Sequence, residues 1–223
     1  MTTKKLSVLI IGGEASIDLN RPWAFDGPGT AISGGYVPRL IEQLQREGWQ
    51  VHTESHAPLD LNVTLPLLQR LNLNRFDLVI LQLGHSQLEM ADTSRWPLGW
   101  IALLLGQIGL FRNVNAQLTD LLFYLQPFRR RLVMLTPLPH PQSVNQWLRN
   151  KGRDLFLKHG RRHMIPVFDT SVILGNGEEF FAQPTGDTLS PTAGDLLGQS
   201  LFDYIQVNAL LPARPEQRQR RGY

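Results

Sequence analysis

The sequence predicts a three-layer α/β/α sandwich built around a parallel β-sheet. Three observations lead to this prediction. Apolar runs with β-branched residues end at glycines, as residues 6–11 (LSVLII) do before Gly12 and residues 77–83 (DLVILQL) before Gly84. Helical stretches with an apolar stripe separate these runs. Each run is apolar at consecutive positions, which is typical of strands that helices cover on both faces.

The expected elements alternate along the chain. Val37, Leu40, Ile41 and Leu44 share one face of an expected helix that ends at Gly48, and Leu118, Leu121, Leu122 and Leu125 share a face of another. The expected strands are 6–11, 49–53, 77–83, 132–135 and 165–168. The expected helices are 36–47, 65–71, 113–126, 143–159 and 192–207. No segment repeats, so we expect a single domain over residues 1–210.

The composition excludes several kinds of site. The 223 residues are 42% hydrophobic, which is enough for a buried core, and contain no cysteine. Disulfides, thiolate zinc sites, iron–sulfur clusters and a cysteine nucleophile are therefore excluded. We expect neither a metal nor a cofactor.

The net charge of +3 comes from the end of the chain, where residues 214–223 hold four arginines against one glutamate. Residues 211–223 have too few apolar side chains to fold, so we expect a basic, disordered tail and no nucleic-acid partner. The basic runs 129–131 and 161–162 flank apolar segments, which indicates solvated helix ends.

The sequence carries no signal for secretion or membrane insertion. The first apolar stretch ends after six residues at Gly12, and no small-residue cleavage site follows. The longest apolar segment, 96–111, has 16 residues and is interrupted by glycines, so it is short for a bilayer span. We expect a cytoplasmic protein without a membrane span.

Residues 96–111, with Trp96 and Trp100, form an apolar insertion after the strand that ends at Gly84. Three roles remain open for it. The insertion could be a lid over a ligand, an interface with a protein partner or with a second copy of the chain, or additional core.

In parallel sheets, ligands bind beyond the carboxyl ends of the strands. This rule places any site in residues 12–16, 53–57, 84–87, 136–140 and 169–171 and in the loop 186–190 before the last helix.

At these segments the chain resembles the SGNH (GDSL-type) hydrolases, a flavodoxin-like family of esterases, lipases and carbohydrate deacetylases. SVLIIGGEAS resembles the first strand with its Gly-Asp-Ser turn, and FDLVILQLGHSQ resembles the strand that ends in Gly-x-Asn-Asp. RRLVMLTPLPHP and MIPVFDTS are similar to the next two strands, and GDTLSPTAGDLLGQSLFDYI to the closing Asp-x-x-His loop and helix. The resemblance spans about residues 6–206 and implies the fold of this family.

The resemblance also implies which residues should carry the chemistry, and here the chain departs from the pattern. In the family, Ser of Gly-Asp-Ser attacks the ester, His of Asp-x-x-His is the base, and backbone N–H groups with Asn hold the oxyanion. In Gly13-Glu14-Ala15, Ala15 stands at the nucleophile position. Ser86 matches the oxyanion Asn and Ser190 matches the base, while Asp187 is retained.

Other side chains at the expected rim could replace the missing groups. The candidates for catalysis beside Asp187 are Glu14, Ser16, Ser86, His85 and His140. The candidates for binding are Gly13, Ala15, His56, Gly84, Ser190, Trp96 and Trp100. The loop also has an alternative role at the start of the last helix, in which Ser190 or Thr192 is the N-cap and Pro191 lies in the first turn. The spacing of the histidines is not that of a metal site.

Two hypotheses for function follow. The first is a catalytically degenerate relative of these hydrolases that binds a small ester-like or carbohydrate ligand, or a protein partner, through the old cleft and residues 96–111. The second is an active ester hydrolase with a rearranged set of residues, in which Ser16, Ser86 or Glu14 works with His56, His85 or His140.

Overall fold

The computed structural model describes residues 4–12, 35–56, 61–83, 88, 99–175, 177–182 and 189–212. In these residues a five-stranded sheet has the strand order β2-β1-β3-β4-β5. The strands are β1 (Lys4–Ile11), β2 (Trp49–His56), β3 (Leu78–Gln82), β4 (Leu132–Leu135) and β5 (Val167–Phe168). All four neighbouring pairs are parallel, as the sequence predicts.

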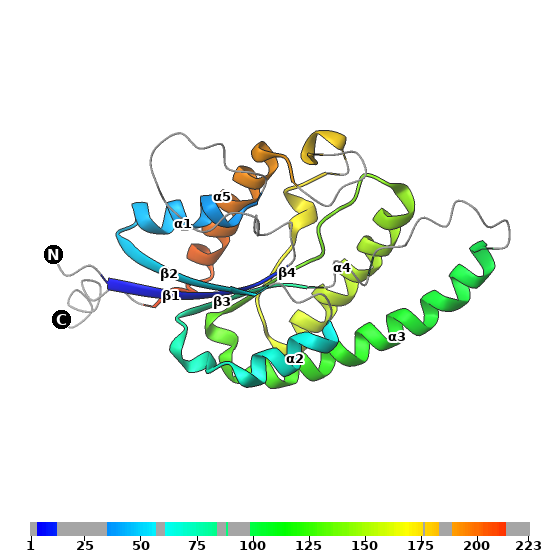
Figure 1. The fold of residues 1–223 in the computed structure, drawn as a ribbon, viewed down its shortest axis with the longest axis horizontal. Coiled ribbons are helices and arrows are strands. Elements are labelled where there is room, and N and C mark those ends of the chain that lie inside the picture. The colour runs from blue at the N-terminus through cyan, green and yellow to red at the C-terminus, as the bar shows by residue number, and fades with distance from the viewer. Residues whose placement is uncertain are drawn as a thin grey trace.

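Helices cover both faces of the sheet and give the predicted three layers (Figure 1). On one face lie α1 (Val37–Arg46) and α5 (Pro191–Val207), which pack against each other. On the other face lie α2 (Leu61–Arg70), α3 (Gly99–Leu125) and α4 (Ser143–His163). None of the described helices is long and apolar enough to cross a membrane.

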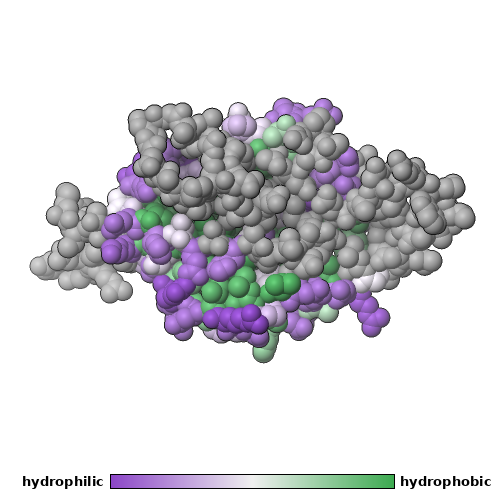
Figure 2. Space-filling model, viewed as in Figure 1, coloured by the Kyte–Doolittle hydropathy of each residue, from purple (hydrophilic) through white to green (hydrophobic). Residues whose placement is uncertain are grey.

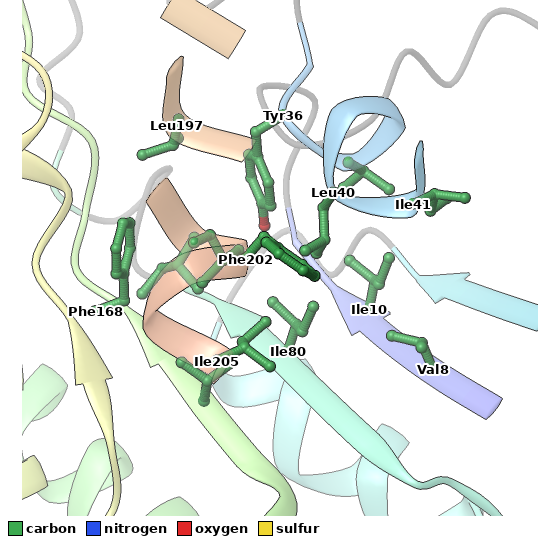
Figure 3. Close-up of a cluster of buried hydrophobic side chains, with 14 of the residues drawn as sticks. Val8, Ile10, Tyr36, Leu40, Ile41, Ile80, Phe168, Leu197, Phe202 and Ile205 are labelled. Atoms are coloured by element: carbon green, nitrogen blue, oxygen red, sulfur yellow. The ribbon is translucent and has the colours of Figure 1, made fainter. Parts of the chain in front are cut away.

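The alternation of side chains along the strands divides the core into two clusters. Val8 and Ile10 of β1 pack with α1 and α5, whereas Leu9 and Ile11 pack with α2 and α3. Figure 3 shows the first cluster, in which the ring and hydroxyl of Tyr36 point in among buried apolar side chains. Strands β3 and β4 are buried along their whole length, which explains why their sequences are almost continuously apolar, whereas the edge strand β2 is mostly polar.

Most predicted elements agree with the structure within a few residues, and three differ in an informative way. Helix α2 begins at Leu61, ahead of the predicted residue 65, and includes Pro66. Strand β5 is limited to Val167–Phe168, because Met164 adopts a left-handed conformation (φ 54°) that ends α4 just before it. The third difference concerns α3.

Helix α3 starts at Gly99 rather than near residue 113, so most of the predicted insertion 96–111 is the first half of one 27-residue helix. A helix of this length is about 40 Å long. In Figure 1 its N-terminal part extends beyond the body of the molecule. An added Cβ at Gly109 would meet nothing within 4 Å. Residues 96–98 and the side chain of Trp100 lie outside the described residues.

Candidate active site at the carboxyl ends of the strands

The carboxyl ends of the strands meet at one edge of the sheet, which we call the rim. Gly12 follows β1, Thr136 follows β4 and Asp169 follows β5, while His56 ends β2. Backbone hydrogen bonds extend the sheet into the rim: the N–H of Gly12 donates to the carbonyl of His56 (3.0 Å), and that of Thr136 to the carbonyl of Phe168 (3.0 Å). The described parts of the predicted rim, which are Gly12, residues 53–56, 136–140 and 169–171 and Ser190, therefore lie where the sequence places them.

Most of the candidate residues lie outside the described part of the chain. These residues are Gly13, Glu14, Ala15, Ser16, Gly84, His85, Ser86, Trp96 and Asp187. The described candidates are His56, His140 and Ser190, and the structure gives each of them specific partners.

His56 forms a pair with a carboxylate. Its Nε2 lies 3.1 Å from Oε1 of Glu54, and the second carboxylate oxygen of Glu54 accepts a hydrogen bond from Arg75. The His56 and Glu54 side chains are 31% and 27% exposed, so solvent reaches the pair. Because the backbone carbonyl of His56 accepts a hydrogen bond from Gly12, this imidazole–carboxylate pair lies beside the carboxyl end of β1.

A polar network joins the ends of β4 and β5. Asp169 accepts hydrogen bonds from Nε (2.9 Å) and Nη2 (2.5 Å) of Arg153 and from the backbone N–H and hydroxyl of Ser171. The hydroxyl of Thr136 accepts from the N–H of Thr170 (2.9 Å) and lies 3.0 Å from the Thr170 hydroxyl. The network fixes the backbone of both strand ends.

The electrostatics of this network favour the charged pair. Burial alone would raise the pKa of Asp169, but the hydrogen bonds from Arg153 and Ser171 outweigh burial and hold that pKa below its ordinary value. The hydrogen bond to Asp169 raises the pKa of Arg153 in turn. An ionised carboxylate whose two oxygens both accept hydrogen bonds from an arginine holds the two elements together, and it is a poor base.

His140 is enclosed by the protein, with 1% of its surface exposed. Its backbone N–H donates to the side-chain oxygen of Gln146, and its Nδ1 accepts from the backbone N–H of Gln142 (3.0 Å). In a neutral imidazole whose Nδ1 accepts, the proton sits on Nε2. Nδ1 of His140 is therefore engaged in holding the loop after β4. Arg149, which is also 1% exposed, donates to the carbonyl of Leu138 in the same loop (3.1 Å).

Ser190 caps helix α5, which confirms the alternative role expected from the sequence. Its hydroxyl accepts from the N–H of Ala193 (3.3 Å) and donates to the carbonyl of Glu179 (2.9 Å). Its backbone N–H donates to the carbonyl of Phe180, and a bridge pairs Phe181 with Leu189. The hydroxyl thus ties the entry of α5 to the preceding segment.

The site residues predicted from the sequence did not include Glu54, Arg149 or Arg153. A signal existed for Arg149, since it lies on the same stripe of α4 as Leu148, Gly152 and Phe156, where a charged residue must find buried partners. Arg153 and Glu54 carry no such signal, because their partners come from other elements. Within the described ranges no three His, Asp or Glu side chains gather as a metal site.

Solved structures share this fold over nearly the whole chain. A lipase/acylhydrolase from Enterococcus faecalis matches with a TM-score of 0.59 and 16% identity, covering 94% of this chain and 98% of its own. A variant of an acetyl xylan esterase from Geobacillus stearothermophilus matches with a TM-score of 0.66 and 13% identity, covering 96% and 100%. A G-D-S-L family protein from Desulfitobacterium hafniense DCB-2 matches with a TM-score of 0.59 and 15% identity, covering 89% and 98%.

The chain has the SGNH-hydrolase fold. The sequence matches no protein-family model and no curated protein, so the likeness is one of structure. At such identities the fold carries no information about activity, which must be argued from the residues at the rim. Two described residues lie at rim positions that correspond to motifs of this fold. Gly12 is at the carboxyl end of the first strand, and Ser190 is at the start of the last helix.

Proposed function

We propose that this protein is a degenerate relative of the SGNH hydrolases that binds a ligand through the old cleft at the rim and does not hydrolyse it. The observation that carries the proposal is the role of Ser190. This position matches the base histidine of the family. Here the Ser190 hydroxyl accepts a hydrogen bond from the N–H of Ala193 and donates one to the carbonyl of Glu179.

Two further features support the loss of the family mechanism. Ala15 stands at the matched nucleophile position and has no group that can attack an ester. His140 is 1% exposed and its Nδ1 accepts from the backbone, so it is unsuited to replace the base. Losing a triad nucleophile or base costs about 10⁴–10⁶ in kcat, and the members act as a unit.

Restoring both groups tests the proposal. We expect the wild-type protein to hydrolyse p-nitrophenyl acetate at near-background rates. The double change Ala15→Ser with Ser190→His should raise the rate at least about tenfold, whereas each single change should do little, because the nucleophile needs its base. Ser190→Ala with Ala15→Ser is the matched control, since it loses the helix cap without gaining an imidazole.

One outcome would contradict the proposal directly. Robust hydrolysis by the wild-type protein, abolished by Ser16→Ala or Ser86→Ala alone, would show a working nucleophile at the rim. A folded double variant with no gain over the wild type would show that the turn after β1 no longer presents the geometry of the family.

Solved proteins of the same fold supply the first ligands to test. These include an acetyl xylan esterase and a lipase/acylhydrolase, so acetylated oligosaccharides and acyl esters are the first ligands to test by thermal shift. Residues 96–111 are proposed as the second contact surface, for the ligand or for a protein partner in the cytoplasm. Trp96→Ser with Trp100→Ser should then lower ligand binding or the mass in light scattering, with little change in melting temperature.

The pair formed by Glu54 and His56 favours one alternative, an active hydrolase with a rearranged set of residues. A carboxylate 3.1 Å from an imidazole holds the ring in one orientation, as a general base requires. If this alternative holds, His56→Gln and Glu54→Gln will both abolish a measurable wild-type activity. His52→Gln, on the exposed part of the same strand, is the control.

A further inference from the structure

The edge of the sheet opposite the rim carries a concentration of positive charge. Arg129 and Arg130 lie in the 3₁₀ turn Gln126–Arg131 that precedes β4, and Lys158, Arg161 and Arg162 lie in the last turns of α4, which precedes β5. Because β4 and β5 are neighbouring parallel strands, both groups lie at the same edge. We call these five residues the basic edge. All are exposed except Arg129, which is half-buried.

The cations of the basic edge have no acidic partner among the described residues. Arg46, Arg75 and Arg153 each form an ion pair with a carboxylate. In the described part of the chain, no carboxylate lies within ion-pair distance of the basic edge. The edge therefore projects uncompensated charge into solvent.

Helix dipoles account for only part of this charge. A helix C-terminus carries about half a negative charge, and the basic edge stands at the ends of two helices, α3 and α4. About one negative charge thus faces five positive ones. Burial lowers the pKa of His159, and the charges of His163, Arg162 and Lys158 lower it further.

Large exposed apolar side chains accompany these cations. Met164 follows Arg162 by two residues and is 64% exposed, in a left-handed conformation (φ 54°) where glycine or asparagine is usual. Phe123, in the last turn of α3 before Arg129, is 73% exposed. Figure 2 shows hydrophobic surface bordered by hydrophilic residues on the lower part of the molecule, below the sheet.

We propose that the basic edge docks the protein on an anionic lipid surface. Exposed cations attract acidic headgroups, and apolar side chains among them can enter the interface between headgroups and acyl chains. A nucleic acid would also bind the cations, but Met164 and Phe123 would not strengthen its binding. Helix α5 ends at this same edge, and the eleven residues that follow Pro212 in the sequence hold four arginines and one glutamate. Docked in this way, the protein would turn the rim toward the aqueous side.

Flotation with lipid vesicles tests the proposal. The full chain should bind vesicles of phosphatidylcholine with about one third phosphatidylglycerol and not vesicles of phosphatidylcholine alone. Each interfacial cation changes partitioning roughly fivefold, so Arg161→Gln with Arg162→Gln should weaken binding about 25-fold, and Arg129→Gln with Arg130→Gln similarly. Met164→Asn, which suits the left-handed backbone, should weaken binding without a change in charge.

The control variants test whether vesicle binding depends on the basic edge or on positive charge anywhere on the surface. Arg112→Gln with Lys151→Gln removes two exposed cations from the earlier parts of α3 and α4 and should leave binding unchanged. Equal loss in that control, or equal binding to neutral vesicles, would overturn the proposal. It would also be overturned if Met164→Asn bound as the wild type while an oligonucleotide competed with the vesicles. If removing residues 213–223 alone abolished binding, the tail and not the basic edge would be the docking element.

Discussion

Replacing Asp169 with asparagine should destabilise the protein by removing the charge that joins β5 to α4. Asparagine keeps the shape of the side chain but loses the negative charge. Arg153 donates to both carboxylate oxygens of Asp169, and Ser171 donates to one of them through its backbone and its hydroxyl. The substitution therefore leaves the guanidinium of Arg153 without its counter-charge while the packing changes little.

The expected loss follows from the burial of the pair. Removing one partner of a fully buried ion pair costs about 3–5 kcal/mol, and a single hydrogen bond to a charged group contributes about 1.5–3 kcal/mol. The side chains of Arg153 and Asp169 are 31% and 17% exposed, so solvent reduces the penalty. We expect Asp169→Asn to lower the free energy of unfolding by about 2–3 kcal/mol at pH 7.

Urea unfolding at pH 7 and in acid measures this loss and its origin. The pKa of Asp169 is lowered in the folded protein from its ordinary value of 3.8. A lowered pKa contributes stability that is fully present above pH 3.8 and is lost as the pH falls below it toward the folded value. The difference between the wild type and Asp169→Asn should therefore narrow as the pH falls below 3.8.

Asp154 provides a matched control, because one of its oxygens lies 3.6 Å from Arg153 while its side chain is 65% exposed. Exposed pairs contribute about 0–1 kcal/mol, so Asp154→Asn should change the free energy of unfolding by less than about 0.5 kcal/mol. Equal losses for the two variants, or a difference that does not narrow in acid, would refute the argument that Asp169 acts through its charge.

Four more variants, one of them a control, test the packing and capping by thermal and urea unfolding. Tyr36→Phe should raise stability by about 1 kcal/mol, because the Tyr36 hydroxyl is buried with no partner among the described residues. Gly198→Ala should lower it by about 1–2 kcal/mol, since a Cβ there would lie 2.5 Å from the carbonyl oxygen of Tyr36. The control Gly109→Ala, which meets nothing within 4 Å, should raise it by up to about 1 kcal/mol. Ser190→Ala should lower it by about 1 kcal/mol through the lost cap.

The fold could be predicted because its signal is local. Strands β3 and β4 are buried along their whole length, so their sequences are almost continuous apolar runs, and the predicted bounds of β4 agree with the observed Leu132–Leu135. The prediction for helix α3 is too short because Gly106 and Gly109 resemble helix breaks, although glycine within a helix costs only about 1 kcal/mol. The prediction for helix α2 is too short because Pro66 resembles a helix start.

The rim could be predicted in position but not in its contacts. Parallel topology alone places Thr136 and Asp169 at neighbouring strand ends. The partner of Asp169 depends on which turn of α4 faces the rim, and the sequence around Arg153 does not mark that turn. The sequence places both Glu54 and His56 in the rim segment 53–57 but predicts that strand β2 ends at residue 53. The observed strand continues to His56, and its alternation puts the two side chains on one face, where they pair.

At position 190, where we propose that the catalytic base was lost, the structure shows a serine that caps helix α5. Serine is among the best N-caps because its short side chain reaches the backbone N–H of the first turn, as Ser190 reaches that of Ala193. A histidine there would point an imidazole into the rim and leave that N–H without its cap. Serine at position 190 lacks the catalytic imidazole but stabilises the start of α5 by about 1 kcal/mol. Such a substitution is expected where activity is no longer required. On this argument Ser190→His alone should melt at a lower temperature than the wild type while hydrolysing esters no faster, and the addition of Ala15→Ser should raise the rate without restoring the melting temperature.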